Sequence, residues 1–173
     1  NKSPINIFVV NKHYPTFNTP NQLIEPLIYI AKKNELTTLD TTTKRKLAID
    51  NFWLTRAGSA NHARNILGNY YGRVFWANRI FTEQKPGWQT DRGKTLILLG
   101  IIEEAFSNGK TERWNYRNKK GKPFTVEFTD TDSTTQVNNF TVSKKFSKDI
   151  EKLAIDGWNT GKPFNFTKSN SNQ

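Results

Sequence analysis

The spacing of apolar residues changes from a helical to a strand period along this chain, and that change constrains the fold most. Between Ser59 and Phe81 the apolar residues recur every three or four positions, which predicts one long amphipathic helix. Its apolar stripe consists of Ala63, Ile66, Leu67, Tyr70, Tyr71, Val74, Ala77 and Phe81. Further on, the runs 114–116 and 124–128 alternate apolar and polar residues, which predicts two antiparallel strands with one buried face.

Shorter elements are predicted around these segments from capping residues and apolar runs. Thr19 before Pro20 is typical of a helix start, and we expect Pro26 to kink that helix. The other predicted elements are a strand over Ile5–Val10, a helix from the capping cluster 40–43 to near Gly58, a strand over Lys94–Leu99, a strand at Phe140–Val142 and a helix over Lys148–Trp158. Helices followed by a small antiparallel sheet and a C-terminal helix make an α+β fold. We expect one domain over residues 1–166 and a disordered tail over 167–173.

Composition narrows the classes of function. The 173 residues carry 26 Lys and Arg against 15 Asp and Glu, for a net charge of +11, and the mean hydropathy is -0.73. Such a surface is either a solvated basic face or a site for an anionic partner, and no nucleic-acid-binding motif accompanies the charge. The sequence has no cysteine, and no stretch approaches the roughly 20 apolar residues of a membrane-spanning helix.

The run from Lys85 to Gly100 joins the long helix to the apolar segment that follows it. Its loop-forming residues are Gly87, Trp88, Thr90, Asp91 and Gly93. Glycine permits tight turns, and short polar side chains bond nearby backbone N–H groups. We therefore predict a rigid structural corner, in which the indole is buried against the long helix and the aspartate is bonded to backbone amides.

These residues spell a known signature, and the chain resembles the GWxTD-domain family, envelope proteins of Gram-negative bacteria with largely unknown function. The resemblance extends to INIFVVNKHYPTF, NQLIEPLIYIA, IDNFWLTRAG, YYGRVFWANRIF and IDGWNTGKP, which together cover most of the chain from Ile5 to Phe164. The chain departs from the family pattern at one place after the motif. Family members usually follow the Leu-Gly pair with a Pro turn, whereas this chain has Gly-Ile-Ile at 100–102. The resemblance implies a periplasmic or outer-membrane location, with any signal or lipid anchor lying before this segment.

The second half also resembles the small barrel-assembly accessory lipoproteins of the SmpA/OmlA type. A Leu-Gly pair, a Trp-x-Tyr strand, an alternating strand and an acidic turn occur in the same order in both. This second resemblance implies an adaptor at the outer membrane.

Catalytic chemistry has little support in the residues. His13 and His62 are the only histidines, and they lack the spacing of a metal site or a catalytic pair. Asp130 and Asp132 share a Thr-rich turn without the closing Glu of a calcium loop. We therefore predict no enzyme activity, no cofactor and no metal.

The polar side of the long helix carries the candidate protein-binding residues Arg73, Trp76 and Arg79. Arg and Trp are enriched where interface energy concentrates, although Trp76 could instead pack under the preceding helix. Gly68 and Gly72, one turn apart, indicate either a close helix contact or glycines tolerated at about 1 kcal/mol each.

Three functions remain open at this point. The first is a non-catalytic protein-interaction module, an accessory subunit of an outer-membrane assembly or secretion complex. The second is an envelope carbohydrate-binding or carbohydrate-processing module, favoured by the many aromatic residues. The third is a basic nucleic-acid-binding protein, which rests on net charge alone.

Overall fold

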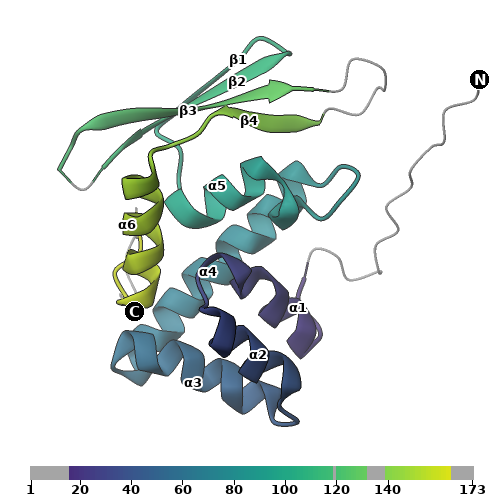
Figure 1. Cartoon of the computed structure of the whole chain (residues 1–173), viewed down its shortest axis with the longest axis vertical. Helices are drawn as coiled ribbons and strands as arrows, with labels where there is room; N and C mark the ends of the chain where they lie inside the picture. The colour runs from purple at the N-terminus through teal and green to yellow at the C-terminus, as the bar shows by residue number, and fades with distance from the viewer. Residues whose placement is uncertain (1–15, 119, 132–138, 165–173) are drawn as a thin grey trace, which may run out of the picture.

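The predicted α+β class is confirmed by a computed structural model, which describes residues 16–118, 120–131 and 139–164 (Figure 1). Its elements are α1 (Pro20–Ile24), η1 (Glu25–Tyr29), α2 (Lys33–Thr41), α3 (Arg45–Ala57), α4 (Ala60–Phe81), η2 (Gly87–Gln89), α5 (Asp91–Leu99), β1 (Glu104–Ser107), β2 (Thr111–Arg117), β3 (Pro123–Asp130), β4 (Phe140–Lys144) and α6 (Lys148–Asn159). The strand predicted at 5–10 and the tail predicted at 167–173 lie outside the described residues.

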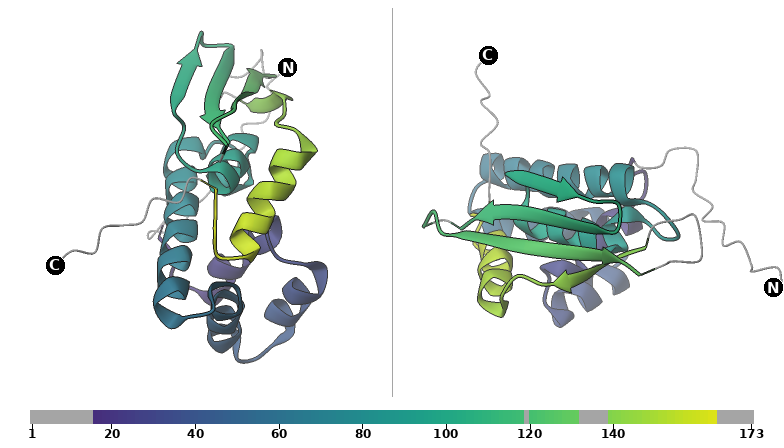
Figure 2. Two further views of the ribbon diagram at one scale, coloured as in Figure 1. Left: turned by 90° about the vertical axis from the view of Figure 1, so that its left-hand side faces the viewer. Right: turned by 90° about the horizontal axis from the view of Figure 1, so that it is seen from above.

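The sheet forms a layer over the helices. Its four strands are antiparallel in the order β1-β2-β3-β4, so β1 and β4 are its edges. Figure 2 shows α4 below the β1 side of the sheet and α6 below the β4 side. The helix-facing surface buries Trp114, Tyr116, Val126 and Phe128, whereas the opposite surface is polar and faces solvent. The two alternating strands predicted from the sequence are therefore present with the expected face buried.

The long predicted helix is α4, and it forms the centre of the core. Ser59 accepts a hydrogen bond from the backbone N–H of His62 and begins the helix. Its buried Tyr70 lies 4.9 Å from the ring of Trp158 in α6 and 5.3 Å from Trp53 in α3, centroid to centroid. A Cβ at Gly68 or at Gly72 would meet no atom within 4 Å, so neither glycine serves a close helix contact.

The first turns follow the sequence signals in part. Thr19 and Gln22 form a capping box at the start of α1, and after α1 the chain continues as the 3-10 helix η1, which contains Pro26. The prediction that the cluster 40–43 begins a helix is wrong, because Asp40 and Thr41 end the unpredicted helix α2 and Thr42 is its C-cap. There the hydroxyl of Thr41 donates to the carbonyl of Thr37, a bond that satisfies the side chain within a helix instead of at its cap.

The apolar run 94–99 is a helix and not the predicted strand. Thr90 caps α5, and the run 94–99 forms all of this helix after its first three residues. The helix ends before Gly100, whose φ of 79° is left-handed. A short buried run has no polar face, so its periodicity does not separate a strand from a helix. The strand of this region is β1 instead, which the sequence did not predict because all four of its residues are exposed.

Candidate functional site

The predicted corner, which consists of Gly87, Trp88, Thr90, Asp91 and Gly93, is built on close backbone contacts that only glycine permits. A Cβ on Gly87 would lie 2.0 Å from the carbonyl oxygen of Ala77 in α4, and a Cβ on Gly93 would lie 1.9 Å from the carbonyl oxygen of Gly87. The hydroxyl of Thr90 donates to that same Gly87 oxygen at 2.7 Å and accepts from the N–H of Gly93 at 2.9 Å. Two glycines and one threonine thus pack η2 against both α4 and α5.

Polar side chains of the α4 end complete the corner. The N–H of Trp88 donates to Asn78 Oδ1 at 3.0 Å, and the N–H of Gly87 donates to Thr82 Oγ1 at 3.0 Å. Asn78 is buried although it is polar, and this hydrogen bond explains why. The backbone amides of η2 are therefore engaged in structural bonds.

We predicted that the indole of Trp88 is buried against the long helix, and that prediction is wrong. It is half-buried and packs edge-on against Tyr29 of η1, with ring centroids 6.0 Å apart. The Tyr29 hydroxyl donates to the carbonyl of Trp88 at 2.7 Å. Burial, and then the negative charge of Asp91, raise the pKa of Tyr29 to about 12. The ring of Trp88 therefore connects the corner to the N-terminal helices.

The carboxylate of Asp91 is bonded to a backbone amide as predicted, and that amide belongs to an edge of the sheet. Its Oδ2 accepts from the N–H of Val142 in β4 at 2.8 Å. Val142 pairs with Phe128, two positions from the pair in which Asp130 lies opposite Phe140. The N–H of Thr131 donates to the carbonyl of Asn139, so these two residues form a hydrogen-bonded pair between β3 and β4. Bonded and non-bonded pairs alternate along an antiparallel ladder, so Val142 is in a non-bonded pair and its N–H points away from β3. The motif aspartate thus caps the outer side of β4.

Arg92 extends the corner and was missed from the sequence. Its guanidinium is buried and forms ion pairs with Glu83 and Glu112, the latter at 2.8 Å. It also lies 4.9 Å from the ring centroid of Phe81 and 4.3 Å from that of Phe140. Burial raises the pKa of Glu83, and the Arg92 charge opposes that shift. The only sequence signal was its position directly after the motif aspartate.

Arg73 is not on the surface of α4, so it cannot join the predicted binding patch. It is 8% exposed, and it donates to the carbonyls of Ile97 at 3.1 Å and Phe164 at 2.7 Å. Its guanidinium lies 5.0 Å from the ring centroid of Trp158. Burial lowers the pKa of Arg73 to about 10. The arginine lies at the border of the apolar stripe, where the carbonyl of Ile97 near the end of α5 and the carbonyl of Phe164 after α6 accept its hydrogen bonds.

Trp76, Arg79 and Ile80 remain on the exposed side of α4, and we call them the α4 outer face. The side chains of Trp76 and Ile80 are 52% and 59% exposed, one helical turn apart. Arg79 is exposed beside them. Trp76 contacts the ring of its neighbour Phe75 at 5.7 Å and does not pack under the preceding helix. Two large apolar side chains and a cation thus share one surface.

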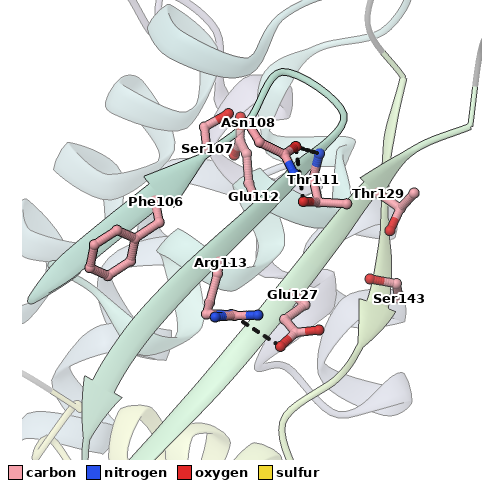
Figure 3. A pocket seen from close by; sticks show the side chains of 9 residues that line it. All are labelled: Phe106, Ser107, Asn108, Thr111, Glu112, Arg113, Glu127, Thr129 and Ser143. Atoms are coloured by element: carbon pink, nitrogen blue, oxygen red, sulfur yellow. Dashed lines mark hydrogen bonds and ion pairs between the residues drawn. The ribbon is translucent and has the colours of Figure 1, made fainter.

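The outer surface of the sheet holds a shallow polar hollow of about 330 Å³ (Figure 3). Phe106 lines it at one edge, and its ring is exposed. Arg113 Nε and Glu127 Oε1 form an ion pair of 3.2 Å along it, and Thr129 and Ser143 lie at its far side (Figure 3). The hollow offers hydroxyls, charges and one ring to a ligand.

The remaining candidate groups do not gather into a reactive centre within the described residues. His62 Nε2 lies 2.6 Å from the carbonyl oxygen of Gly161, and His13 and Asp132 lie outside the described segments. No group of three His, Cys, Asp or Glu in residues 16–118, 120–131 and 139–164 is placed to hold a metal ion. In the same residues no helix combines the length and apolarity needed to cross a bilayer.

Comparison with known proteins identifies the family. No curated protein and no solved structure matches the chain. The GWxTD domain matches residues 1–160, which is most of the 173-residue sequence. That span includes the corner built by Gly87, Trp88, Thr90 and Asp91. The chain therefore belongs to the GWxTD-domain family.

Proposed function

We propose that this chain is a non-catalytic protein-interaction module of the bacterial envelope, an accessory subunit of an outer-membrane assembly or secretion complex. The α4 outer face binds the partner protein. The observation that carries this proposal is the exposure of Trp76 and Ile80 on a helix whose other side is packed into the core. Trp and Arg are the residues that most often dominate binding energy at interfaces.

The motif itself serves the scaffold in this proposal. The side-chain oxygens of Thr90 and Asp91 are bonded to backbone groups of the fold, and the two glycines are closed against neighbouring backbone. Because these oxygens and glycines are engaged with the backbone of the fold, the motif holds α4, α5 and β4 in place. The corner fixes the end of α4, and with it the orientation of the α4 outer face.

A crosslinking pull-down from native envelopes tests the proposal. The variant combines Trp76→Ala with Arg79→Glu, and leaves the buried Arg73 unchanged so that the fold survives. We expect recovery of the crosslinked partner to fall about tenfold or more, since interface hot spots contribute at least about 2 kcal/mol. The matched control is Leu47→Ala, which removes a similarly exposed apolar side chain, 54% accessible, from α3. Recovery at the wild-type level from a folded double variant contradicts the proposal.

Carbohydrate binding is the second candidate, and the hollow on the outer sheet surface favours it. An exposed ring beside hydroxyl and charged groups resembles the surface that a sugar ring stacks on. Envelope saccharides titrated against the chain, with Phe106→Ala as the variant, test this candidate. Loss of saccharide binding with an unchanged pull-down assigns the hollow to carbohydrate.

A further inference from the structure

One row of residues runs along the exposed side of α4, each four positions from the next. The row consists of Arg64, Gly68, Gly72, Trp76 and Ile80, and we call it the α4 row. Residues four apart on a helix lie about one turn apart and form a continuous row on its surface. All are exposed except Gly72, which is partly exposed, and α4 borders the helical layer in the left view of Figure 2. The α4 outer face is therefore one end of a longer surface.

Two glycines leave a gap in the α4 row. A Cβ on Gly68 or on Gly72 would meet no atom within 4 Å, so no described residue fills the space above them. Glycine inside a helix lowers the stability of the helix, because its unfolded backbone has more freedom to lose. Neither glycine has a positive φ that would require it. Between Arg64 and Trp76 the two glycines thus form a trough, about one side chain deep, that packing inside the chain does not explain.

A shielded polar atom lies on the same side of α4. Asn69 Oδ1 has less than 1 Å² of exposed area and accepts no hydrogen bond from the described residues. Asn69 precedes Trp76 by seven residues, which is about two helical turns, so both side chains leave the helix in nearly the same direction. A shielded acceptor without a donor costs folding free energy. This side of α4 therefore has an acceptor that a donor from a partner would satisfy.

The charge of α4 selects the class of partner. The 22 residues of the helix include no Asp or Glu, and Arg64 and Arg79 lie toward the two ends of its exposed side. The exposed Arg113 and Arg117 each pair with a glutamate, whereas Arg79 has no ion pair among the described residues. The α4 helix of a second copy would bring cations against cations. A partner with acidic side chains instead complements this surface.

A helix is the element that fits this surface. The backbone groups of α4 are bonded within the helix, so they offer no hydrogen bonds to an extended segment, whose own groups would be buried unpaired. A partner helix satisfies its own backbone. Rows of residues four apart on two helices interdigitate at a crossing angle of about −50°. Glycine at the crossing lets the two axes approach to the lower end of the usual distance of about 8–10 Å.

We propose that the partner protein binds the α4 outer face through an amphipathic helix that crosses α4 over the trough. The inference rests on the proposed function and names the element of the partner that this face receives. Apolar side chains of that helix enter the space above Gly68 and Gly72 and pack on Trp76. Its polar flank carries acidic side chains beside Arg79 and a hydrogen-bond donor for Asn69.

Filling the trough tests the close approach. Gly68→Leu combined with Gly72→Leu puts two side chains into open space, so the fold should survive and α4 should become more stable. In the crosslinking pull-down from native envelopes, we expect partner recovery to fall about tenfold or more, as at other interface hot spots. The matched control is Asn51→Leu with Thr55→Leu, an exposed pair at the same spacing in α3, and should recover the partner at the wild-type level.

Photocrosslinking identifies the structure of the bound segment. A photoreactive benzoylphenylalanine replaces Asn65 in one variant and Ile80 in another, and the captured residues of the partner are located by mass spectrometry. We expect both variants to capture one segment of one protein, at positions about three or four apart, with Asp or Glu among them. Captured positions about two apart indicate a strand and overturn the inference. Capture of a segment without acidic residues overturns it as well.

A synthetic peptide of the captured segment tests the charge. Arg79→Glu should weaken its binding about tenfold, and reversal of the facing acid to Lys in the peptide should restore most of the affinity. Equal binding by the natural chain and by Arg79→Glu overturns the assignment of an acidic partner helix.

The inference and the proposed function fail separately. Loss of the partner both in the double leucine variant and in Trp76→Ala with Arg79→Glu supports both. Loss in the second variant alone keeps the proposed function and overturns the helix in the trough. Wild-type recovery in both variants, or loss in the leucine variant alone, contradicts the function and the inference together. If the leucine variant is misfolded by circular dichroism, Gly68→Ala with Gly72→Ala takes its place, with a several-fold loss expected.

Discussion

The two edges of the sheet differ in what happens to their outward backbone groups. At β4, the outward N–H of Val142 is bonded to the carboxylate of Asp91, and α5 lies against the strand. At β1, the outward groups of Ala105 and Ser107 face solvent beside an exposed Phe106. Proteins protect edge strands from unwanted pairing with charges and coverings. Here the family motif provides that protection at one edge, and the other edge is uncovered in the described residues.

The corner that closes the β4 edge depends first on its glycines. Gly87→Ala would place a methyl group 2.0 Å from the Ala77 carbonyl oxygen, so η2 must move away from α4. We expect a loss of about 3 kcal/mol or more in the free energy of unfolding, from denaturant titration. The control Gly68→Ala, in open space within α4, should gain up to about 1 kcal/mol. Equal stability of the two variants would remove the corner from this comparison.

Removal of the capping carboxylate should open the β4 edge directly. Asp91→Ala leaves the Val142 N–H without its acceptor, and we expect a loss of about 2 kcal/mol in the free energy of unfolding. The variant should also aggregate faster at high concentration, because both sheet edges are then open. The control Asp50→Ala changes an exposed carboxylate in α3 and should do neither. An Asp91→Ala chain as stable and soluble as this control would mean that the bond to Val142 is dispensable.

The parts of the fold that could be predicted from the sequence are those whose local pattern matches their tertiary environment. The stripe of α4 and the alternation of β2 and β3 each have one buried and one exposed face, so their periods are visible. Most of the run 94–99 is buried in α5, where only Lys94 and Leu96 are partly exposed, and all of β1 is exposed, so neither shows a clear period. Arg73 was misplaced because its burial depends on carbonyls from α5 and from the segment after α6.

The candidate site was predictable to the same extent. The corner followed from residue types that act locally, namely two glycines, a capping threonine and an aspartate. The donor that Asp91 accepts from could not be predicted in this way, because Val142 is 51 residues away in sequence. The outward side of a strand likewise depends on register, which a pattern of exposed residues does not contain.

The contact of Tyr29 with Trp88, which links the corner to the N-terminal helices, should contribute less to stability than Gly87 or Asp91. Tyr29→Phe removes the hydrogen bond to the Trp88 carbonyl but keeps the contact between the rings, so we expect a loss of about 1 kcal/mol. Tyr29→Ala removes both and should cost more. Thermal unfolding of the two variants measures the difference. If Tyr29→Phe were as damaging as Tyr29→Ala, the hydroxyl and not the ring would hold the corner.

Acid should lower the free energy of unfolding through Glu151, near the end of β4, by less than the substitutions above do. Burial alone raises the pKa of Glu151, but hydrogen bonds from Lys94 and Lys145 outweigh it, so the pKa lies below its ordinary 4.5. Because the folded pKa is the lower one, this stabilisation is present above pH 4.5 and is lost as the pH falls through the folded value. Stability measured from pH 6 to 3 should fall less steeply in Glu151→Gln than in the natural chain. Parallel curves would show that the two ion pairs of Glu151 do not stabilise the end of β4.

Native-state amide hydrogen exchange, resolved by residue, measures both edges in one experiment. At about 1 µM protein we expect the N–H of Val142 to be protected, and those of Ala105 and Ser107 to exchange at nearly the free rate. Exchange of Val142 as fast as that of Ala105, or protection of Ala105 and Ser107 already at about 1 µM, would contradict the claim that the motif closes one edge and leaves the other open.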